Sequence, residues 1–289
     1  MQNQKTGPTA DAAGGITRRQ ILLASGATAL GLAVGITPSY AAAAAATEAR
    51  AMSGDKIKAL LFDVQGTIVD FYSTIVREGE KFTRARGIEA AWTKITEQWR
   101  GGYRKRLDDV ISGKVEWRST DAIYRDALDD VLAEYPWGDK LSATERDELN
   151  GLWSRLDPWP DTVPGLTRLR RKFTLSTLSN GSMASVVGIV KHGGLPMDAV
   201  LTAELVKSSK PDPKVYALGS SSLALRPEQI LMVACHKYDL AGARKFGFNV
   251  AFIQRPLEFG PAGKVDTGPE DYFDFMAPNL EALAGQLGA

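Results

Sequence analysis

One stretch decides the fold of this 289-residue chain: Leu60-Leu61-Phe62-Asp63-Val64-Gln65-Gly66-Thr67. A short apolar run that ends in a turn is typical of a strand buried in a parallel sheet. Asp63 follows that run directly, and open α/β sheets bind their ligands at the carboxyl ends of the strands. A carboxylate in that place can serve as a metal ligand, a general base or a nucleophile. The alternative is an aspartate that only caps the next turn.

The first part of the chain has the pattern of an export signal. Arg18 and Arg19 precede a moderately apolar run through Ile36, and an alanine tract follows at 41–46. Basic, apolar and small residues in this order are typical of a bacterial signal peptide, and paired arginines are typical of the twin-arginine type. We therefore predict a cleaved signal at residues 1–46 and a periplasmic or otherwise exported protein without a membrane anchor. A disordered alanine-rich leader is the alternative.

The overall composition is that of an ordinary soluble globular protein, with 44% hydrophobic and 24% charged residues. The formal net charge of +1 offers no basic surface for nucleic acid or an anionic membrane. Cys235 is the single cysteine, so an intrachain disulfide is excluded.

After the signal, strand-like and helical segments alternate on either side of one long helical block. The predicted strands are 56–63, 173–179, 199–203, 229–234 and 250–254, and the predicted helices are 183–192, 213–225 and 239–246. Such alternation predicts an α/β fold with a doubly wound parallel sheet. Residues 71–159 are amphipathic and Trp-rich, and no alternating strand pattern interrupts them. We predict that they form a helical cap domain inserted into a core domain made of 56–70 and 160–289.

Four segments carry polar residues at the carboxyl ends of predicted strands, namely 63–67, 177–182, 209–216 and 234–239. Because the carboxyl ends of parallel strands meet at one edge of a sheet, we expect these segments to form one site. Each segment has a simpler explanation. Ser179 and Asn180 can cap a helix, Lys210 can be a solvated loop lysine, and Asp239 can cap its own helix.

The order of these segments resembles the haloacid dehalogenase superfamily, over essentially everything from Lys56 to the C-terminus. That superfamily uses a nucleophilic Asp for phosphoryl transfer with magnesium or for halide displacement without metal. Its phosphatases resemble Asp-x-Asp-Gly-Thr, and Gln65 stands here in place of their general acid. Cys235 stands where they have a further magnesium-binding Asp, and a thiol suits a hard cation poorly. A magnesium-dependent phosphatase is therefore the weaker alternative.

The 2-haloacid dehalogenases resemble this chain more closely. Their Leu-Ser-Asn-Gly-Ser is matched by 178–182, their Lys-Pro-Asp-x-x-Val-Tyr by 210–216, and their aromatic-Asp-x-x-Gly-Ala-Arg by 238–244. Their Trp-Arg pair is found here as Trp99-Arg100. The resemblance implies a Rossmann-like core with a helical cap. It also implies cofactor-free, metal-free hydrolysis of short 2-haloalkanoic acids, L-enantiomers by resemblance, to 2-hydroxy acids with inversion. An exported binding protein without turnover is an alternative function of another class. The sequence leaves open whether the protein forms a homodimer.

The resemblance assigns the chemical steps to particular residues. Asp63 would attack the substrate and form an aspartyl ester, Lys210 would keep Asp63 ionised, and Asp239 would activate the hydrolytic water. Arg100 and Asn180 would stabilise the departing halide.

The remaining assignments concern positioning. Thr67 and the backbone amides around Ser179 and Asn180 would hold the substrate carboxylate or Asp63, and Tyr216 would orient Lys210. Tyr238 is the aromatic residue of the last motif, and we count it among the substrate-binding residues.

Three positions depart from the dehalogenase pattern. Gln65 replaces a Tyr, which makes part of the substrate pocket polar, and Ala234 and His236 replace a Ser and an Asn. His236 is a candidate either to orient Asp239 or to act with it as a base on water, because its pKa lies near working pH. The alternative is a packed histidine. His192, near a predicted helix end, is expected to be a C-terminal cap residue.

Overall fold

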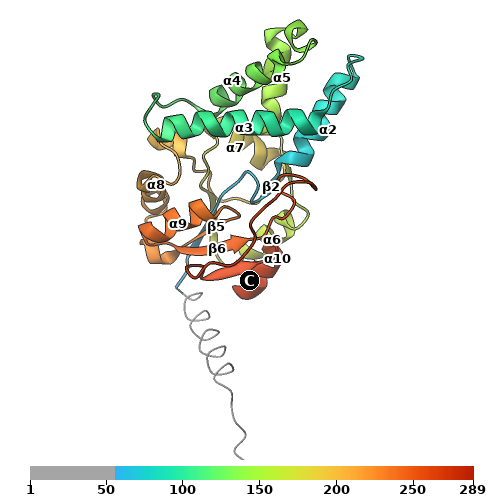
Figure 1. Cartoon of the computed structure of the whole chain (residues 1–289). Helices are drawn as coiled ribbons and strands as arrows, with labels where there is room; N and C mark the ends of the chain where they lie inside the picture. Colours follow the sequence, from blue (N-terminus) through green and yellow to red (C-terminus); the bar gives the residue numbers. More distant parts are fainter. Residues whose placement is uncertain (1–55) are drawn as a thin grey trace, which may run out of the picture. The chain divides into compact units, whose positions relative to one another are not determined.

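The computed structural model describes residues 56–289 (Figure 1). The predicted export signal, residues 1–46, lies outside the described residues. The described part has a five-stranded sheet with helices on both faces, and a helical region is inserted after the first strands. This arrangement confirms the predicted doubly wound α/β class with an inserted helical region.

The sheet is parallel, and its strand order is β4-β1-β5-β6-β7. Its strands are β1 (Ala59–Phe62), β4 (Thr174–Thr177), β5 (Ile230–Ala234), β6 (Asn249–Ile253) and β7 (Phe275–Ala277). Phe62, the last residue of β1, pairs with Thr177 on one side and Val233 on the other. Because these strands end level with one another, the segments that follow them emerge at one edge of the sheet.

Every residue of β1 is buried, which explains why this strand is uniformly apolar. Leu60 and Phe62 belong to a hydrophobic cluster on one face of the sheet, and Leu61 belongs to a second cluster on the other face. Successive strand residues point to opposite faces, so a central strand covered by helices on both sides needs apolar residues at every position.

The helices of the core are α6 (Thr162–Leu169), α7 (Met183–His192), α8 (Pro213–Leu223), α9 (Lys237–Phe246) and α10 (Leu280–Gln286), with the short 3-10 helices η3 (Ala203–Val206) and η4 (Pro227–Gln229). Figure 1 shows α8 and α9 on one side of the sheet and α6 and α10 on the other. Residues of α8 and α9 pack in the cluster that contains Leu61, and those of α6, α7 and α10 pack in the cluster that contains Phe62.

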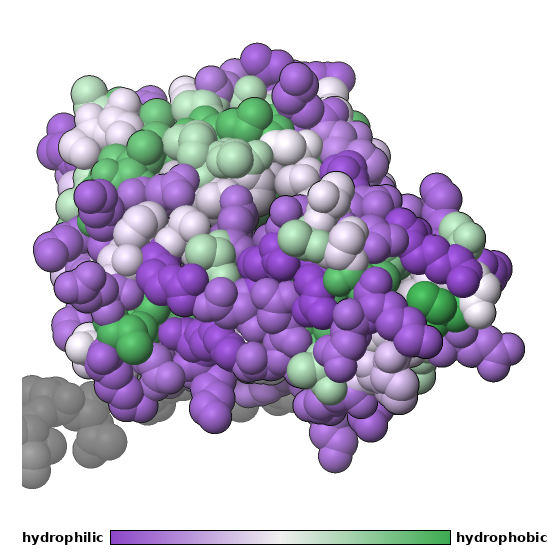
Figure 2. All heavy atoms as spheres, turned by 90° about the horizontal axis from the view of Figure 1, so that it is seen from above, coloured by the Kyte–Doolittle hydropathy of each residue, from purple (hydrophilic) through white to green (hydrophobic). Residues whose placement is uncertain are grey.

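The inserted region lies over the carboxyl edge of the sheet (Figure 1). It contains α2 (Phe71–Arg84), α3 (Trp92–Ile111), α4 (Thr120–Ala133), η1 (Gly138–Lys140), α5 (Ala143–Asn150) and η2 (Gly151–Ser154). The chain leaves the core through β2 (Val69–Asp70) and returns through β3 (Asp157–Pro158), and these two strands pair antiparallel. Trp92, Trp99 and Trp153 are fully buried. The surface seen from above, which is the side of the insertion, is mainly hydrophilic (Figure 2).

Some predicted elements differ from the observed ones. The predicted strand 199–203 forms only isolated bridges, at Ala199 and Thr202, because the chain turns into η3 before a ladder can extend. The predicted helix 239–246 begins earlier, at Lys237, so Asp239 lies within its first turn. The sequence analysis did not predict α6, β7 or α10. Within residues 56–289, no helix is long and apolar enough to cross a membrane.

Candidate active site

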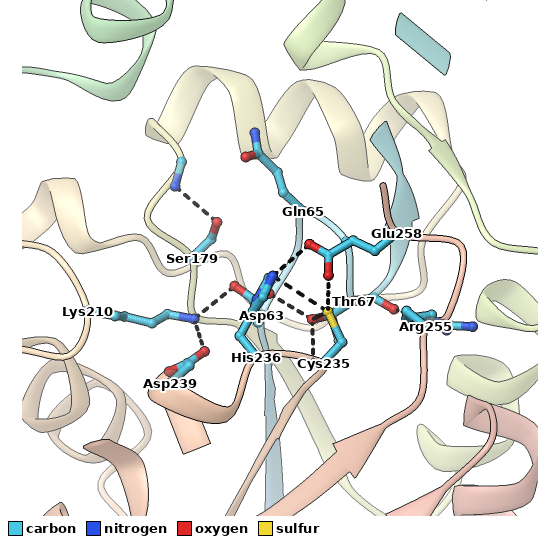
Figure 3. Close-up of polar contacts among 12 residues, drawn as sticks. Asp63, Gln65, Thr67, Ser179, Lys210, Cys235, His236, Asp239, Arg255 and Glu258 are labelled. Atoms are coloured by element: carbon cyan, nitrogen blue, oxygen red, sulfur yellow. Dashed lines mark hydrogen bonds and ion pairs between the residues drawn. The ribbon is translucent and has the colours of Figure 1, made fainter. Parts of the chain in front are cut away.

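The candidate site lies at the carboxyl edge of the sheet, where the segments after β1, β4 and β5 meet (Figure 3). Asp63 is at its centre. Figure 3 shows Lys210 and Asp239 on one side of Asp63, and His236 and Glu258 on the other.

Asp63 is 8% exposed, and three side chains donate hydrogen bonds to its carboxylate. Lys210 Nζ lies 3.0 Å from Oδ1, while Thr67 Oγ1 and His236 Nδ1 lie 2.7 Å and 3.0 Å from Oδ2. Burial acts to raise the pKa of the Asp63 carboxyl, but the charge of Lys210 and the hydrogen bond from His236 outweigh burial and hold it well below its ordinary value. Asp63 is therefore ionised at neutral pH, as a nucleophile must be.

Lys210 is 1% exposed and joins two carboxylates. Its Nζ lies 3.0 Å from Asp63 Oδ1 and 2.6 Å from Asp239 Oδ2. Burial acts to lower the pKa of Lys210, but the charges of Asp239 and Asp63 outweigh burial and raise it. The ammonium form therefore persists, and the alternative of a solvated loop lysine does not apply.

Asp239 is fully buried in the first turn of α9. Tyr216 Oη donates to Asp239 Oδ1 and to the Asp239 carbonyl oxygen, each over 3.0 Å. Tyr216 was predicted to orient Lys210. The hydrogen bonds of Lys210 Nζ go to the carboxylates of Asp63 and Asp239, so Tyr216 can act on Lys210 only through Asp239. Burial, together with the charge of Asp63, raises the pKa of Asp239 against the opposing effect of Lys210.

His236 is the N-cap residue of α9, and its ring lies between two carboxylates. Nδ1 is 3.0 Å from Asp63 Oδ2, and Nε2 is 2.8 Å from Glu258 Oε1. Burial acts to lower the pKa of His236, but the acidic neighbours Cys235, Asp63 and Glu258 outweigh burial and raise it well above its ordinary value. The hypothesis that His236 orients Asp239 is corrected, because the hydrogen bonds of the ring go to Asp63 and Glu258.

Glu258 is a site residue that the sequence analysis missed. It lies in the loop after β6, is 1% exposed, and its Oε2 is 3.7 Å from Cys235 Sγ. The one sequence signal that could have found it is its position beyond the carboxyl end of a predicted strand, the same rule that identified the other four segments.

Gly66 leaves the space that Glu258 occupies. Its φ is +85°, and a Cβ added there would lie 2.6 Å from Glu258 Oε1. The turn after Asp63 therefore needs glycine at this position for two reasons, the backbone conformation and the close approach of Glu258.

We expect Gly66→Ala to lower the free energy of unfolding by about 1 kcal/mol for the backbone and by roughly 1–3 kcal/mol more for the displacement of Glu258. Urea unfolding measures both parts. Gly113→Ala is the matched control, because Gly113 has φ +74° and open space around its Cβ position, so that only the backbone cost applies. Equal losses in the two variants would show that the Glu258 contact contributes nothing.

The helical region places a cation above this edge. Arg100, on α3, donates to Gln65 Oε1 over 3.1 Å and contacts the hydroxyl of Tyr124, which itself lies 2.9 Å from Gln65 Oε1. The Arg100 guanidinium carbon lies 4.9 Å from the centre of the Phe71 ring and 5.0 Å from that of Tyr103. A cation packed among aromatic rings is weakly hydrated and binds anions well. The sequence analysis missed Tyr124.

Ser179, Asn180 and Tyr238 complete the predicted set. Ser179 Oγ accepts from the Gly181 amide, and Asn180 Oδ1 accepts from the Lys210 amide over 2.8 Å. Neither caps α7, whose N-cap is Ser182. Tyr238 is 37% exposed, and the Arg104 guanidinium lies 5.0 Å from its ring centre.

Two cavities adjoin the site. A small chamber of about 20 Å³ is lined by Asp63, Gln65, Arg100, Tyr103, Arg104, Leu107, Ser179, Asn180, Gly181, His236 and Tyr238. A larger cavity of about 570 Å³ shares four of these residues, namely Arg100, Arg104, His236 and Tyr238. Asp239 and Tyr216 line neither cavity. His236, in contrast, faces both.

Metal binding is limited by the type of donor atoms present. Asp63, Cys235 and His236 offer ligand atoms that all lie within 4.8 Å of one another. Magnesium needs oxygen ligands in near-octahedral geometry, and a thiol beside an imidazole does not supply them. The donor set therefore does not fit the magnesium ion that the phosphatases of this fold use.

Comparisons with known proteins agree with this geometry. A family model described as haloacid dehalogenase-like hydrolase matches residues 57–247. The chain is 33% identical over 207 residues to (S)-2-haloacid dehalogenase of Pseudomonas sp. (strain YL), covering 70% of this chain and 84% of that protein. The fold resembles the crystal structure of a defluorinating L-2-haloacid dehalogenase, with a TM-score of 0.78, 33% identity, and coverage of 81% of this chain and 96% of that one. It also resembles that of a second L-2-haloacid dehalogenase, with a TM-score of 0.77, 37% identity, and coverage of 80% and 99%.

Proposed function

The chain belongs to the haloacid dehalogenase-like hydrolase family, and on that basis we propose that it is an L-2-haloacid dehalogenase. It hydrolyses short 2-haloalkanoic acids to 2-hydroxy acids with inversion at C2. The observation that carries this proposal is the buried, ionised Asp63 carboxylate, which lines a small chamber together with the aromatic-packed guanidinium of Arg100.

The first half-reaction forms an ester. An oxygen of Asp63 attacks C2 of the substrate, the new C–O bond replaces the carbon–halogen bond, and halide leaves with the bonding electron pair. Lys210 and Thr67 hold the carboxylate in place for attack. Arg100 supplies the positive charge that halide needs in a chamber with little room for water. Asn180 lines the same chamber, while its Oδ1 fixes the Lys210 backbone.

The second half-reaction hydrolyses the ester, and we assign its base to His236 with Glu258 instead of Asp239. Asp239 is fully buried between Lys210 and Tyr216 and lines neither cavity, so water does not reach it there. Once Asp63 is esterified, its negative charge no longer raises the pKa of His236. The loss of that charge favours release of the His236 proton to solvent in the larger cavity that it also lines.

Neutral His236 removes a proton from water, and the hydroxide attacks the carbonyl carbon of the Asp63 ester. The bond from that carbon to the alkoxide of the 2-hydroxy acid breaks, and the alkoxide takes a proton from His236. The proton of the regenerated Asp63 carboxyl then passes to His236, which restores the ionised Asp63. Glu258 holds the ring through Nε2 throughout.

We expect Glu258→Gln to lower kcat by on the order of 10²-fold, because it removes the charge that makes His236 a strong base. Ester formation needs no base and continues, so the ester accumulates. Mass spectrometry of acid-quenched enzyme, after incubation with L-2-chloropropionate, should show an added carboxyethyl group. Glu228→Gln, which changes an exposed glutamate paired with Arg226, is the control and should show neither effect. A slow Glu258→Gln variant without trapped ester would contradict the assignment of His236 with Glu258 as the base that activates water.

The direct test of the function is halide release from racemic 2-chloropropionate in the presence of EDTA. We expect chloride release despite EDTA, because no metal takes part. The release should stop near half conversion, because only one enantiomer is used. p-Nitrophenyl phosphate with magnesium is assayed in parallel. Phosphate release without chloride would replace the dehalogenase proposal with the phosphatase alternative, and binding of haloacid without turnover would favour the binding protein.

We also propose that the protein is exported. This proposal is supported by the sequence alone, through the Arg18-Arg19 pair and the apolar and alanine-rich segments that follow it.

A further inference from the structure

Three side chains beside Asp63 bring sulfur, nitrogen and oxygen atoms together. Cys235 Sγ lies 3.7 Å from His236 Nε2 and 3.7 Å from Glu258 Oε2, and Figure 3 shows the three side chains pointing toward one another. Cys235 and Glu258 are 4% and 1% exposed. The proposed reaction uses the imidazole and the carboxylate but gives the buried Cys235 thiol no part. Thiol, imidazole and carboxylate are the donors that zinc accepts in proteins, and magnesium does not share this preference.

The spacing of the three donors is close to that of a tetrahedral zinc ion. Zinc bonds of about 2.3 Å to sulfur and about 2.0–2.2 Å to nitrogen or oxygen separate a sulfur ligand from the other ligands by about 3.6 Å. Both distances from Cys235 Sγ, at 3.7 Å, agree with this value. The distance from His236 Nε2 to Glu258 Oε1 is 2.8 Å, which is that of a hydrogen bond. Zinc would replace this hydrogen bond, and the two atoms must then separate by about half an ångström.

The other nitrogen of the His236 ring is already held in the way that zinc ligands require. Nδ1 lies 3.0 Å from Asp63 Oδ2, and this contact leaves Nε2 on the side of Cys235 and Glu258. A histidine that binds a metal through one nitrogen almost always donates its other ring N–H to a carboxylate, a carbonyl or water, which fixes the orientation of the ring. Asp63 supplies that carboxylate here.

The charge of the site and its access to solvent also suit a divalent cation. When zinc binds, the proton on Cys235 Sγ and the proton on His236 Nε2 leave to solvent. Two positive charges enter as two protons leave, so the ion adds no net charge to this buried region, where an uncompensated charge would be costly. His236 lines the larger cavity of about 570 Å³, which offers a path for the ion and a water molecule as fourth ligand.

We infer that Cys235, His236 and Glu258 form a zinc site that inhibits the enzyme. Neutral imidazole has one nitrogen with a free electron pair, and zinc on Nε2 uses it, so the remaining proton stays on Nδ1. His236 then cannot take a proton from water, and the Asp63 ester is not hydrolysed. Attack of Asp63 on the substrate does not need this base and continues. Zinc binding is independent of the reaction, while the inhibition rests on the proposed function.

The first test detects the site without any substrate, through cobalt(II) in place of zinc. Cys235 is the single cysteine of the chain, so a thiolate-to-cobalt charge-transfer band in the near ultraviolet reports on this site alone. We expect the band to saturate at one cobalt per chain and to disappear when zinc is added. The absence of the band with cobalt in large excess would overturn the zinc site.

Two variants separate this site from zinc bound elsewhere on the protein. Cys235→Ala should abolish the cobalt band and weaken zinc binding by more than about 100-fold, since even the loss of a group that only orients a ligand costs up to that factor. Competition with a chromophoric chelator measures the affinity. His192→Gln changes the other histidine of the chain, which pairs with Asp157 at the surface, and should leave both readouts unchanged.

Glu258→Gln is the second variant if Cys235→Ala fails to fold, which near-UV circular dichroism checks. It should weaken zinc binding by roughly tenfold or more. Unchanged zinc affinity in a folded Cys235→Ala variant, or in Glu258→Gln, would overturn the assignment of the ligands.

The last test measures the inhibition. With zinc bound, L-2-chloropropionate should yield about one chloride per chain and leave the ester on Asp63, and excess EDTA should restore turnover. Cys235→Ala should release chloride at the same rate with and without zinc. Zinc that binds at Cys235 but leaves chloride release unchanged would overturn the inhibitory role. A protein that releases no chloride even with EDTA would contradict the proposed function, while the cobalt titration would still decide the zinc site.

Discussion

Asp63→Asn is expected to abolish halide release and to lower kcat by about 10⁴-fold or more, as the removal of a covalent nucleophile does in other enzymes. An amide has nearly the shape of the carboxylate but is a far poorer nucleophile, so the carbon–halogen bond is not attacked. Chloride release in single-turnover and steady-state assays measures the loss. Asp266→Asn, at an exposed surface aspartate paired with Lys237, is the control and should retain full activity.

The same variant distinguishes an enzyme from a binding protein. Calorimetric titration with L-2-chloropropionate should show that Asp63→Asn still binds the acid, because Arg100 and the rest of the chamber are unchanged. Chloride release at the rate of the unchanged protein would exclude Asp63 as the nucleophile.

Lys210→Met is expected to cost about 3–5 kcal/mol of unfolding free energy, because it leaves buried carboxylates without their cation. Lys210 Nζ lies 3.0 Å from Asp63 and 2.6 Å from Asp239, so both carboxylates lose this partner at once. The two carboxyls then lose the ammonium that they share, and the pKa of Asp63 rises. We expect kcat to fall on the order of 10³-fold with it. Urea unfolding and chloride release measure the two effects.

Lys237→Met is a closely matched control. Lys237 also contacts two carboxylates, Asp266 and Glu270, at 2.7 Å and 2.9 Å, but this group lies at the surface. Exposed ion pairs contribute about 0–1 kcal/mol, so Lys237→Met should change stability little. If the two variants lost the same stability, burial would not be the source of the Lys210 contribution.

Much of the core could be predicted from the sequence because its signals are local. The helix predicted at 183–192 is observed with the same bounds, since Ser182 supplies the N-cap and Lys191 and His192 end the last turn. The strand predicted at 199–203 was wrong, because β propensity alone could not show that the chain would turn into η3. His192 was expected to be a C-terminal cap residue. It is the last residue of α7, but the C-cap is Gly193, and His192 Nε2 lies 2.7 Å from Asp157, a contact that joins α7 to β3.

The partners of the site residues were harder to predict. Gln65 was expected to be a pocket wall, and the structure adds that its carbonyl oxygen accepts from both Arg100 and Tyr124. Glu258 stands in a loop without any motif, and its importance depends on a contact across 22 residues of chain with His236. No local pattern encodes such a contact.

The sequence by itself determined most of the alternation of strands and helices, the buried central strand and the segments that meet at its carboxyl edge. These features follow from apolar periodicity and turn residues, which act within a few positions of the chain. Only the tertiary structure decided that His236 lies between Asp63 and Glu258, that Tyr216 bonds Asp239, and that a larger cavity adjoins the chamber. Hydrogen bonds and charges depend on distances of a few ångströms between groups far apart in sequence, and those distances exist only once the chain is packed.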